Sequence, residues 1–148
     1  MAIDDLYERD FYVWTQEQAA ALRAAGKAGG RSNAVDWDRV AEEVEDLGKS
    51  EYREAANYVT RILEHFFKLA WTQREEPKDS WRAEIDVFRL NVEECLTASL
   101  RAKVDADMER LHRIAAKQAT VSFLKHEPEA ARDETLRWTL DDVLGDAP

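Results

Sequence analysis

Acidic residues crowd one short stretch of the sequence, and carboxylates at such density could bind a hard cation or dock a basic partner. The acids between positions 36 and 47 are Asp36, Asp38, Glu42, Glu43, Glu45 and Asp46. The helix dipole favours acids only in the first turn, so it does not explain Glu42, Glu43 and Glu45. Because runs of charge mostly face water, a solvated helix face is the favoured interpretation. The alternative is contact with a basic partner or with arginines of the same chain, for which Arg82 and Arg89 are the nearest candidates.

Histidines are the second group that could do chemistry. His65 is predicted on the shoulder of a helix, where a half-buried imidazole could titrate, bind a metal or act as a base. A boundary histidine that hydrogen-bonds to a neighbour is the favoured interpretation. His126 is expected in a loop with no visible partner. A small ligand- or metal-binding enzyme that combines the acidic helix 36–47 with His65 or Arg82 is the alternative function that these residues support.

One Glu-x-x-His pair, Glu109 and His112, invites comparison with di-iron helical bundles. Such a site needs two of these pairs and two further inward-facing glutamates. The partners are missing from the sequence. At about 100° per residue, His112 lies nearly a right angle away from the apolar stripe of its helix, and Glu109 lies further round. We therefore predict that both side chains face solvent and that the chain has no metal site.

Motifs for nucleophilic catalysis and for nucleotide binding do not occur. No serine lies in Gly-x-Ser-x-Gly, and neither glycine-rich phosphate-binding pattern is present. The single cysteine, Cys95, falls on an apolar helical stripe, where a thiol is normally inert packing. We expect no cofactor, and the sequence favours a protein without catalytic activity.

Composition excludes further classes of protein. The chain has 148 residues, 35% of them charged, with a net charge of −10, which is typical of a globular domain rather than a disordered one. Lysines and arginines form no basic stripe, so nucleic acid is not an expected partner. No apolar run approaches the roughly 18–20 residues that span a bilayer. The first ten residues are acidic and resemble no signal peptide, so we expect a cytoplasmic protein without membrane contact.

Helices must position the candidate residues, because apolar residues recur at spacings of three and four and no strand-like alternation persists. The first helix is predicted over 15–25, with a capping box of Thr15 and Gln18 and a left-handed end at Gly26. Residues 1–14 would form an aromatic arm before it. The second helix, 36–47, would break or kink at 48–50, although Gly48 could also permit close helix approach.

Four more helices follow in the prediction. The helix over 50–72 has an apolar arc wide enough to contact several neighbours. The next begins at Asp79 or Ser80, and Ser99 caps a fifth that continues to about position 118. Thr139 and Asp142 have the spacing of a capping box at the start of a short last helix. The result is an all-α, compact bundle of about five to six helices in a single domain, residues 1–148.

Four stretches of the chain carry a family resemblance. They are Leu6–Ala19, Asp36–Glu51, Ser80-Trp81-Arg82 with the apolar residues after it, and Trp138–Leu144. In this order they resemble the bacterial domain-of-unknown-function family 29. The connector 27–32, which is glycine-rich, and the Arg137-Trp138 pair depart from the family pattern. The resemblance implies an all-helical bacterial domain with no established activity, and it transfers no catalytic residues.

Function is therefore predicted at a general level. The leading hypothesis is a protein-interaction or regulatory module without catalysis, which forms a homo-oligomer or binds another protein. It rests on the wide apolar arc of 50–72, the aromatic residues of 1–14 and the missing catalytic motifs. The candidate partner or ligand surface comprises Glu42, Glu43, Glu45, Arg82 and His65. These residues could form a packed acid–arginine network or the edge of a functional groove.

Overall fold

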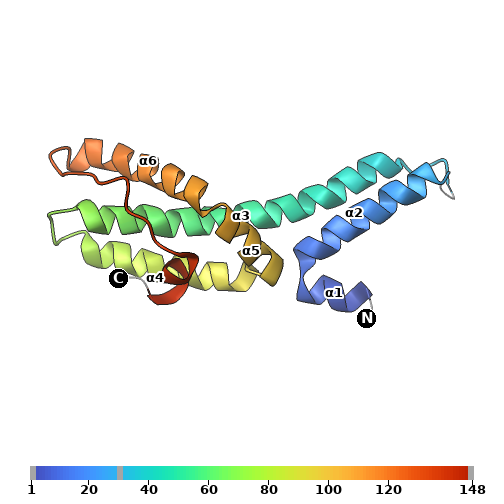
Figure 1. The fold of residues 1–148 in the computed structure, drawn as a ribbon, viewed down its shortest axis with the longest axis horizontal. Coiled ribbons are helices and arrows are strands. Elements are labelled where there is room, and N and C mark those ends of the chain that lie inside the picture. Colours follow the sequence, from blue (N-terminus) through green and yellow to red (C-terminus); the bar gives the residue numbers. More distant parts are fainter. Residues whose placement is uncertain (1–2, 30–31, 147–148) are drawn as a thin grey trace. The chain divides into compact units, whose positions relative to one another are not determined.

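The computed structural model describes residues 3–29 and 32–146, and these residues contain helices and no strand. The helices are α1 (Ile3–Arg9), α2 (Phe11–Lys27), α3 (Trp37–Trp71), α4 (Lys78–Cys95), α5 (Ala98–Ala106), α6 (Met108–His126) and the π-helical η1 (Asp142–Asp146) (Figure 1). The predicted all-α fold is confirmed. None of the helices in these ranges has both the length and the apolar character that a membrane span requires.

Two compact units make up the chain, and α3 runs through both. The first unit contains Met1–Glu54 and Thr97–Ala102. The second contains Ala55–Leu96 and Lys103–Pro148.

In the first unit, α2 begins at Phe11 and not at Thr15, so the predicted capping box of Thr15 and Gln18 is wrong. Asp10 is the N-cap residue, and its carboxylate accepts a hydrogen bond from the Val13 N–H at 3.2 Å. Thr15 lies inside the helix, where its Oγ1 donates to the Tyr12 carbonyl at 2.6 Å. A side-chain acceptor is what a helix start needs, and a buried aspartate supplies it one turn earlier than the sequence pattern indicated.

The residues predicted as an aromatic arm, where the structure describes them, form α1 and the start of α2 with Asp10 between the two helices. The rings of Tyr7, Phe11 and Trp14 pack against one another, with edge-to-face geometry at 5.3 and 4.8 Å and a stacked pair at 5.7 Å. Gly26 does not end α2 as predicted. It lies within the helix. A Cβ at this position would come 2.7 Å from the Cβ of Trp37, so the glycine makes room for that side chain. The left-handed φ of +97° occurs at Gly29 instead.

The predicted break at Gly48 is also wrong, since α3 is one helix of 35 residues. It starts as predicted, with the Asp36 carboxylate accepting from the Arg39 N–H at 3.1 Å. Gly48 is buried within it and contacts Thr15 of α2. A glycine inside a helix costs about 1 kcal/mol relative to alanine, which tertiary packing can offset. The close helix approach that Gly48 also suggested is therefore what the structure contains.

We expect Gly48→Ala to lower the free energy of unfolding by about 1–2 kcal/mol, although alanine is the better helix former. A Cβ there would overlap the Oγ1 of Thr15, whose side chain is fully buried and holds the Tyr12 carbonyl. Urea denaturation followed by circular dichroism measures the change. In a Thr15→Ala background the same substitution should be tolerated, because the overlapping atom is gone. An alanine that stabilises both backgrounds equally would contradict the close contact.

In the second unit, α4 and α6 pack along the C-terminal part of α3 (Figure 1). Its centre is the fully buried ring of Phe67, which meets Trp71 at 5.3 Å, Trp138 at 5.0 Å and His112 at 6.3 Å. A helix with so wide an apolar arc buries it by contacting several neighbours, as the sequence predicted for 50–72.

The single helix expected from Ser99 to about position 118 is two helices, α5 and α6, separated at Asp107. The Oγ1 of Thr97 accepts from the Leu100 N–H at 3.4 Å, so Thr97 and not Ser99 takes the capping position. The break resets the helical phase. The buried face of α6 is therefore set by its own residues, Leu111, His112, Ala115, Ala116, Ala119 and Phe123.

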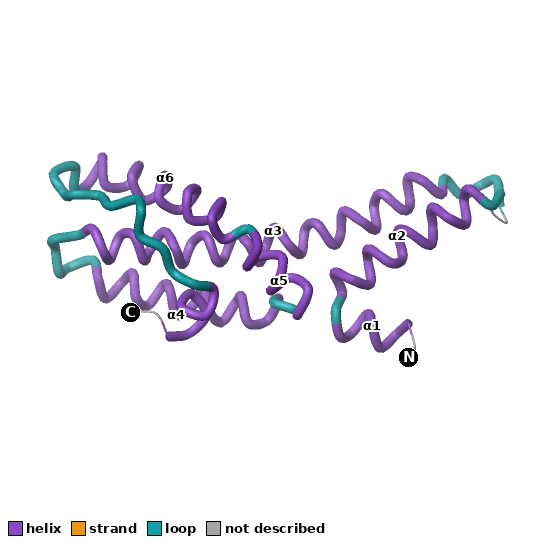
Figure 2. The backbone as a smooth tube through the Cα atoms, viewed as in Figure 1, coloured by secondary structure: helices purple, strands orange, loops and turns teal. Residues whose placement is uncertain are grey.

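Between α6 and η1 the chain runs without regular structure along the outside of the second unit (Figure 2). Side chains hold it in place. The indole N–H of Trp71 donates to the Asp133 carbonyl at 3.1 Å. The predicted capping box at its end is confirmed, since Thr139 and Asp142 exchange backbone-to-side-chain hydrogen bonds at 2.9 and 3.1 Å.

Candidate functional site

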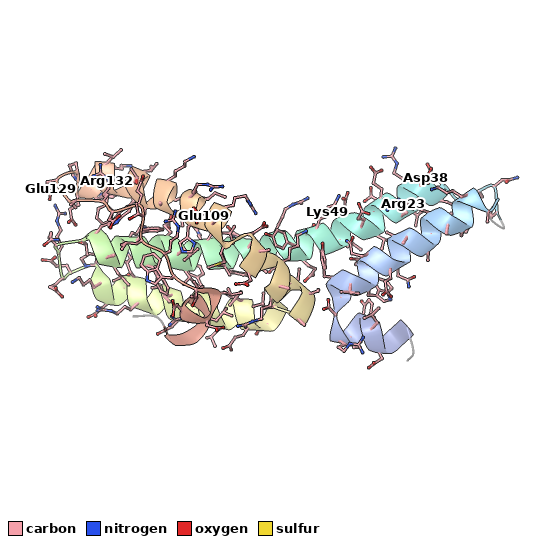
Figure 3. All side chains as sticks on the ribbon, viewed as in Figure 1. Arg23, Asp38, Lys49, Glu109, Glu129 and Arg132 are labelled. Carbon is pink, nitrogen blue, oxygen red and sulfur yellow. The ribbon has the colours of Figure 1, made fainter. Side chains whose placement is uncertain are left out.

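The acidic stretch of α3 lies partly in solvent and partly in an ion pair. Glu42 and Glu43 are exposed. Glu45 accepts from Arg23 of α2 at 2.8 Å and lies 3.2 Å from Lys49, two bases that Figure 3 labels. The hydrogen bond from Arg23 lowers the pKa of the Glu45 carboxyl. The chain thus provides an arginine for this face, but from α2, a source that the sequence pattern did not indicate.

His65 and Arg82 have partners of their own in the second unit. His65 is buried, and its Nδ1–H donates to the Arg61 carbonyl at 2.8 Å while Nε2 contacts the Glu84 carboxylate. The predicted hydrogen bond to a neighbour is present, but the prediction of a half-buried side chain at the boundary is wrong, because His65 is 4% exposed. Arg82 is exposed and lies 3.5 Å from Asp79. Of the five residues of the predicted surface, Glu42, Glu43 and Glu45 belong to the first unit, and His65 and Arg82 belong to the second.

His112 is buried, so the prediction that it faces solvent is wrong. Its Nδ1–H donates to the Met108 carbonyl at 2.7 Å, and its Nε2 accepts from the Trp138 N–H at 3.0 Å. Its ring also stacks on the indole of Trp138. These two hydrogen bonds define one neutral tautomer, because a second ring N–H would point at the Trp138 donor. His112 is a structural tie between α6 and the C-terminal segment.

Glu109 faces solvent as predicted. Arg137 binds its carboxylate in bidentate fashion, at 3.0 and 2.9 Å. The hydrogen bond from Arg137 lowers the pKa of the Glu109 carboxyl. In the described part of the chain, no group of three or more histidine, cysteine or acidic side chains is placed to hold a metal ion.

We expect the His112 ring to titrate below the ordinary histidine pKa of about 6.5. Burial lowers its pKa, the Met108 carbonyl raises it, and Arg137 lowers it again. The unfolded chain therefore takes up a proton at a pH where the folded chain does not. Stability should fall as the pH drops below about 6.5, with a slope of at most about 1.4 kcal/mol per pH unit. Proton NMR of the ring, compared with the chain in urea, measures the shift, and coincident titrations would contradict it.

A cleft of about 830 Å³ lies where the start of α4 meets the end of α6. We call it the α4–α6 cleft. It is lined by Arg74, Glu76, Pro77, Trp81, Ser122, Phe123, His126 and Glu127. The rings of Trp81 and Phe123 meet at 6.3 Å and form its apolar part. Trp81 lies in the first turn of α4, immediately after the loop that contains Pro77.

Glu127 fixes one wall of the α4–α6 cleft. Its carboxylate is buried and accepts from the Thr72 hydroxyl at 2.7 Å and the Gln73 N–H at 3.0 Å, with Arg74 at 3.7 Å. Burial raises the pKa of Glu127, but the hydrogen bonds from Gln73 and Thr72 and the charge of Arg74 outweigh it, and the pKa is lower than usual. The carboxylate is thus anionic at neutral pH, and its oxygens are already occupied.

The other polar groups of the cleft are free. Glu76, Ser122 and His126 have no hydrogen bond or ion pair with any residue that the structure describes, and Ser122 and His126 lie one turn apart on α6. The sequence holds one signal for this pair, a polar i, i+4 spacing beside Phe123. It holds no signal for the approach of Glu76 and Trp81.

Comparison with known proteins identifies the family. The family described as "Domain of unknown function DUF29" matches residues 6–147. The chain belongs to this family. The resemblance seen in the sequence is therefore confirmed.

A solved structure supports the all-helical architecture. An α-helical protein of unknown function from Rhodospirillum rubrum superposes on this DUF29 chain with a TM-score of 0.80 at 26% identity. The match covers 95% of this chain and 90% of the other. No curated protein matches the sequence.

The Ser122–His126 pair of the cleft lacks the geometry of an activated nucleophile. A serine becomes a nucleophile when a base accepts its proton and a third group orients that base. Ser122 and His126 share no hydrogen bond, and His126 has no orienting partner in the described ranges. What the cleft offers is an aromatic surface with a few unpaired polar groups around it, which is the usual composition of a ligand pocket.

Proposed function

We propose that this DUF29 chain is an interaction module without catalysis, and that it binds its partner in the α4–α6 cleft. The observation that supports this is the set of unpaired polar groups, Glu76, Ser122 and His126, beside the apolar rings of the cleft. Glu76 and His126 are exposed and Ser122 is half-buried, so their polar groups are hydrated and available to a ligand that displaces the water. The volume of about 830 Å³ falls within the range of ligand pockets.

Three buried ionisable groups are paired within the chain, one of them in the wall of the cleft. Asp10, His112 and Glu127 each use their polar atoms to hold backbone or side-chain groups of the chain itself. Their shifted pKa values have a structural cause, and structural networks shift pKa values as active sites do. Among the described residues, the buried side-chain polar atom without a partner is Trp14 Nε1, outside the cleft, so the cleft is distinguished by unpaired groups that solvent reaches and not by buried ones.

Site-specific crosslinking tests the proposal. A photo-reactive benzoylphenylalanine replaces His126 in the cleft, and as a control it replaces Val121, which is 70% exposed on the same helix. We expect a discrete crosslinked product from position 126 in cells of the native host, and its loss when Ser122→Arg fills the cleft. Identical products from both positions, or a product that Ser122→Arg leaves unchanged, would refute binding in the cleft.

Self-association is a second candidate, supported by exposed apolar residues one turn apart on α4. Val87 and Leu90 are 56% and 64% exposed. Apolar pairs of this kind on a helix surface are typical of contact faces. Light scattering at micromolar concentration tests the candidate: a dimer that Leu90→Glu dissociates would support it, and a monomer would exclude it.

A further inference from the structure

We infer that the α4–α6 cleft takes a cationic group on an apolar stem, namely an arginine or lysine side chain of a partner protein. This inference rests on the proposed function, because it names the chemistry of the partner that binds in the cleft. Charge, free hydrogen-bonding groups and the apolar surface each point to it.

The charges of the cleft sum to a negative value. Arg74 is the one permanent cation among the lining residues, and it is already engaged by Glu129 at 3.2 Å and by Glu127 at 3.7 Å. Glu76 forms no ion pair with any base that the structure describes. Glu127 stays ionised because its pKa is lowered. Of the neighbouring bases, Lys78 pairs with Glu75 at 2.9 Å and Lys68 with Glu64 at 3.7 Å. Lys125 of α6 has no ion pair among the described residues, but Glu129 beside Arg74 offsets its charge. A cation therefore meets a favourable potential in the cleft.

The unpaired groups match a ligand with several donors. The carboxylate of Glu76 accepts hydrogen bonds only, the Ser122 hydroxyl accepts or donates, and a neutral His126 offers one acceptor nitrogen. A guanidinium or ammonium group supplies donors alone, and a charge-assisted bond to a carboxylate is about twice as strong as a neutral one. A ligand carboxylate would instead face the carboxylate of Glu76.

The aromatic surface suits the stem of such a side chain. Methylene groups of arginine and lysine pack on apolar surface while the charged end stays polar. Trp81 already accepts a cation in this way, since the Nζ of Lys68 lies 5.7 Å from its ring centroid. Trp81, Phe123 and Pro77 provide the apolar contact next to the free acceptors. A cation over tryptophan is worth about 0.5–1 kcal/mol at an exposed site.

The test uses the full chain labelled with 5-fluorotryptophan and observed by ¹⁹F NMR. The Trp81 signal is assigned with Trp81→Phe. Capped tripeptides Ala-X-Ala, with arginine, citrulline or glutamate at X, are the probes. We expect the arginine peptide to shift the Trp81 signal saturably, and the neutral citrulline peptide to bind at least about fivefold more weakly.

A matched pair of variants tests whether the carboxylate of Glu76 is the charge that binds the arginine peptide. Glu76→Gln should weaken binding of the arginine peptide at least about threefold, because it removes the free carboxylate of the cleft. Glu93→Gln removes the same charge from an exposed position farther along α4, outside the cleft, and should change binding by less than about 1.5-fold. Equal effects of the two variants would show that only the long-range field matters and would overturn the inference.

The remaining outcomes separate the inference from the proposed function. Equal binding of the arginine and citrulline peptides, tighter binding of the glutamate peptide, or no saturable shift of the Trp81 signal would each overturn the cationic ligand. If crosslinking at position 126 nevertheless captures a partner, the proposed function stands with another ligand chemistry. If both experiments fail, both proposals fall.

Discussion

Asp10→Ala is expected to lower the free energy of unfolding by about 3 kcal/mol. One buried carboxylate holds the starts of two helices, because Asp10 accepts from the Val13 N–H of α2 and from the Ser99 N–H of α5 at 3.1 Å. It also accepts from the hydroxyls of Ser99 at 2.7 Å and Thr97 at 3.2 Å. Losing a cap costs about 1 kcal/mol, and each buried donor left without an acceptor costs about 1–3 kcal/mol.

Two further variants make the Asp10 prediction specific. Asp10→Asn keeps one acceptor oxygen and should retain part of the stability. Asp5→Ala removes an exposed acid paired with Arg9, and should cost less than about 0.5 kcal/mol. Urea denaturation and hydrogen exchange of the Val13 and Ser99 amides measure the effects. If Asp10→Ala cost no more than Asp5→Ala, the double cap would be disproved.

The pH dependence of this contact has a defined sign. Burial raises the pKa of Asp10, but the hydrogen bonds from Ser99, Val13 and Thr97 outweigh it and the pKa is lowered. An aspartate with a lowered pKa contributes its stability above its ordinary pKa of about 3.9 and loses it as the pH falls through the folded-state value. The Asp10 contribution should therefore be complete at neutral pH.

His112→Ala should destabilise the chain by about 3–4 kcal/mol, the cost of removing a large ring from a packed core. The ring is 2% exposed, stacks on Trp138 and meets Phe67 edge to face. Its removal also leaves the Trp138 N–H without an acceptor. His112→Phe keeps the ring volume and loses the acceptor, so it should cost about 1–2 kcal/mol.

The control for the His112 variants lies on the same helix. His126→Ala removes an exposed imidazole at the end of α6 and should change the free energy of unfolding by less than about 0.5 kcal/mol. Thermal and urea denaturation measure all three variants. A His112→Ala chain as stable as His126→Ala would mean that the C-terminal segment does not depend on this contact.

The spacing of apolar residues along the sequence was sufficient to predict that the fold is all-α. Spacings of three and four predicted the helices, and the Thr139–Asp142 capping box and the Asp36 start of α3 were both correct. These features depend on residues within one or two turns of each other, which the sequence displays directly. The pattern failed at Thr15 and Ser99, because Asp10 satisfies donors from two segments far apart in the sequence.

Helix continuity and the faces of helices needed the tertiary structure. Gly48 was predicted to break α3, but packing against Thr15 makes the glycine useful within an unbroken helix. His112 was predicted to face solvent because the apolar stripe was centred between Met108 and Leu111. The buried face of α6 is instead rotated away from the half-buried Met108 and includes His112 and Ala116. Each residue turns a helix by about 100°, so a stripe centred half a residue away is enough to bury a side chain expected outside.

The candidate cleft is a further feature that the sequence alone did not predict. By itself the sequence determined an all-α domain, its family resemblance and the absence of catalytic motifs, because each follows from residue types at short spacing. Only the tertiary structure decided that Glu76, Trp81, Ser122 and His126 line one cavity and that Arg23 pairs with Glu45. The physical reason is that these contacts join side chains from different helices, whose approach depends on packing and leaves no periodic signal in the chain.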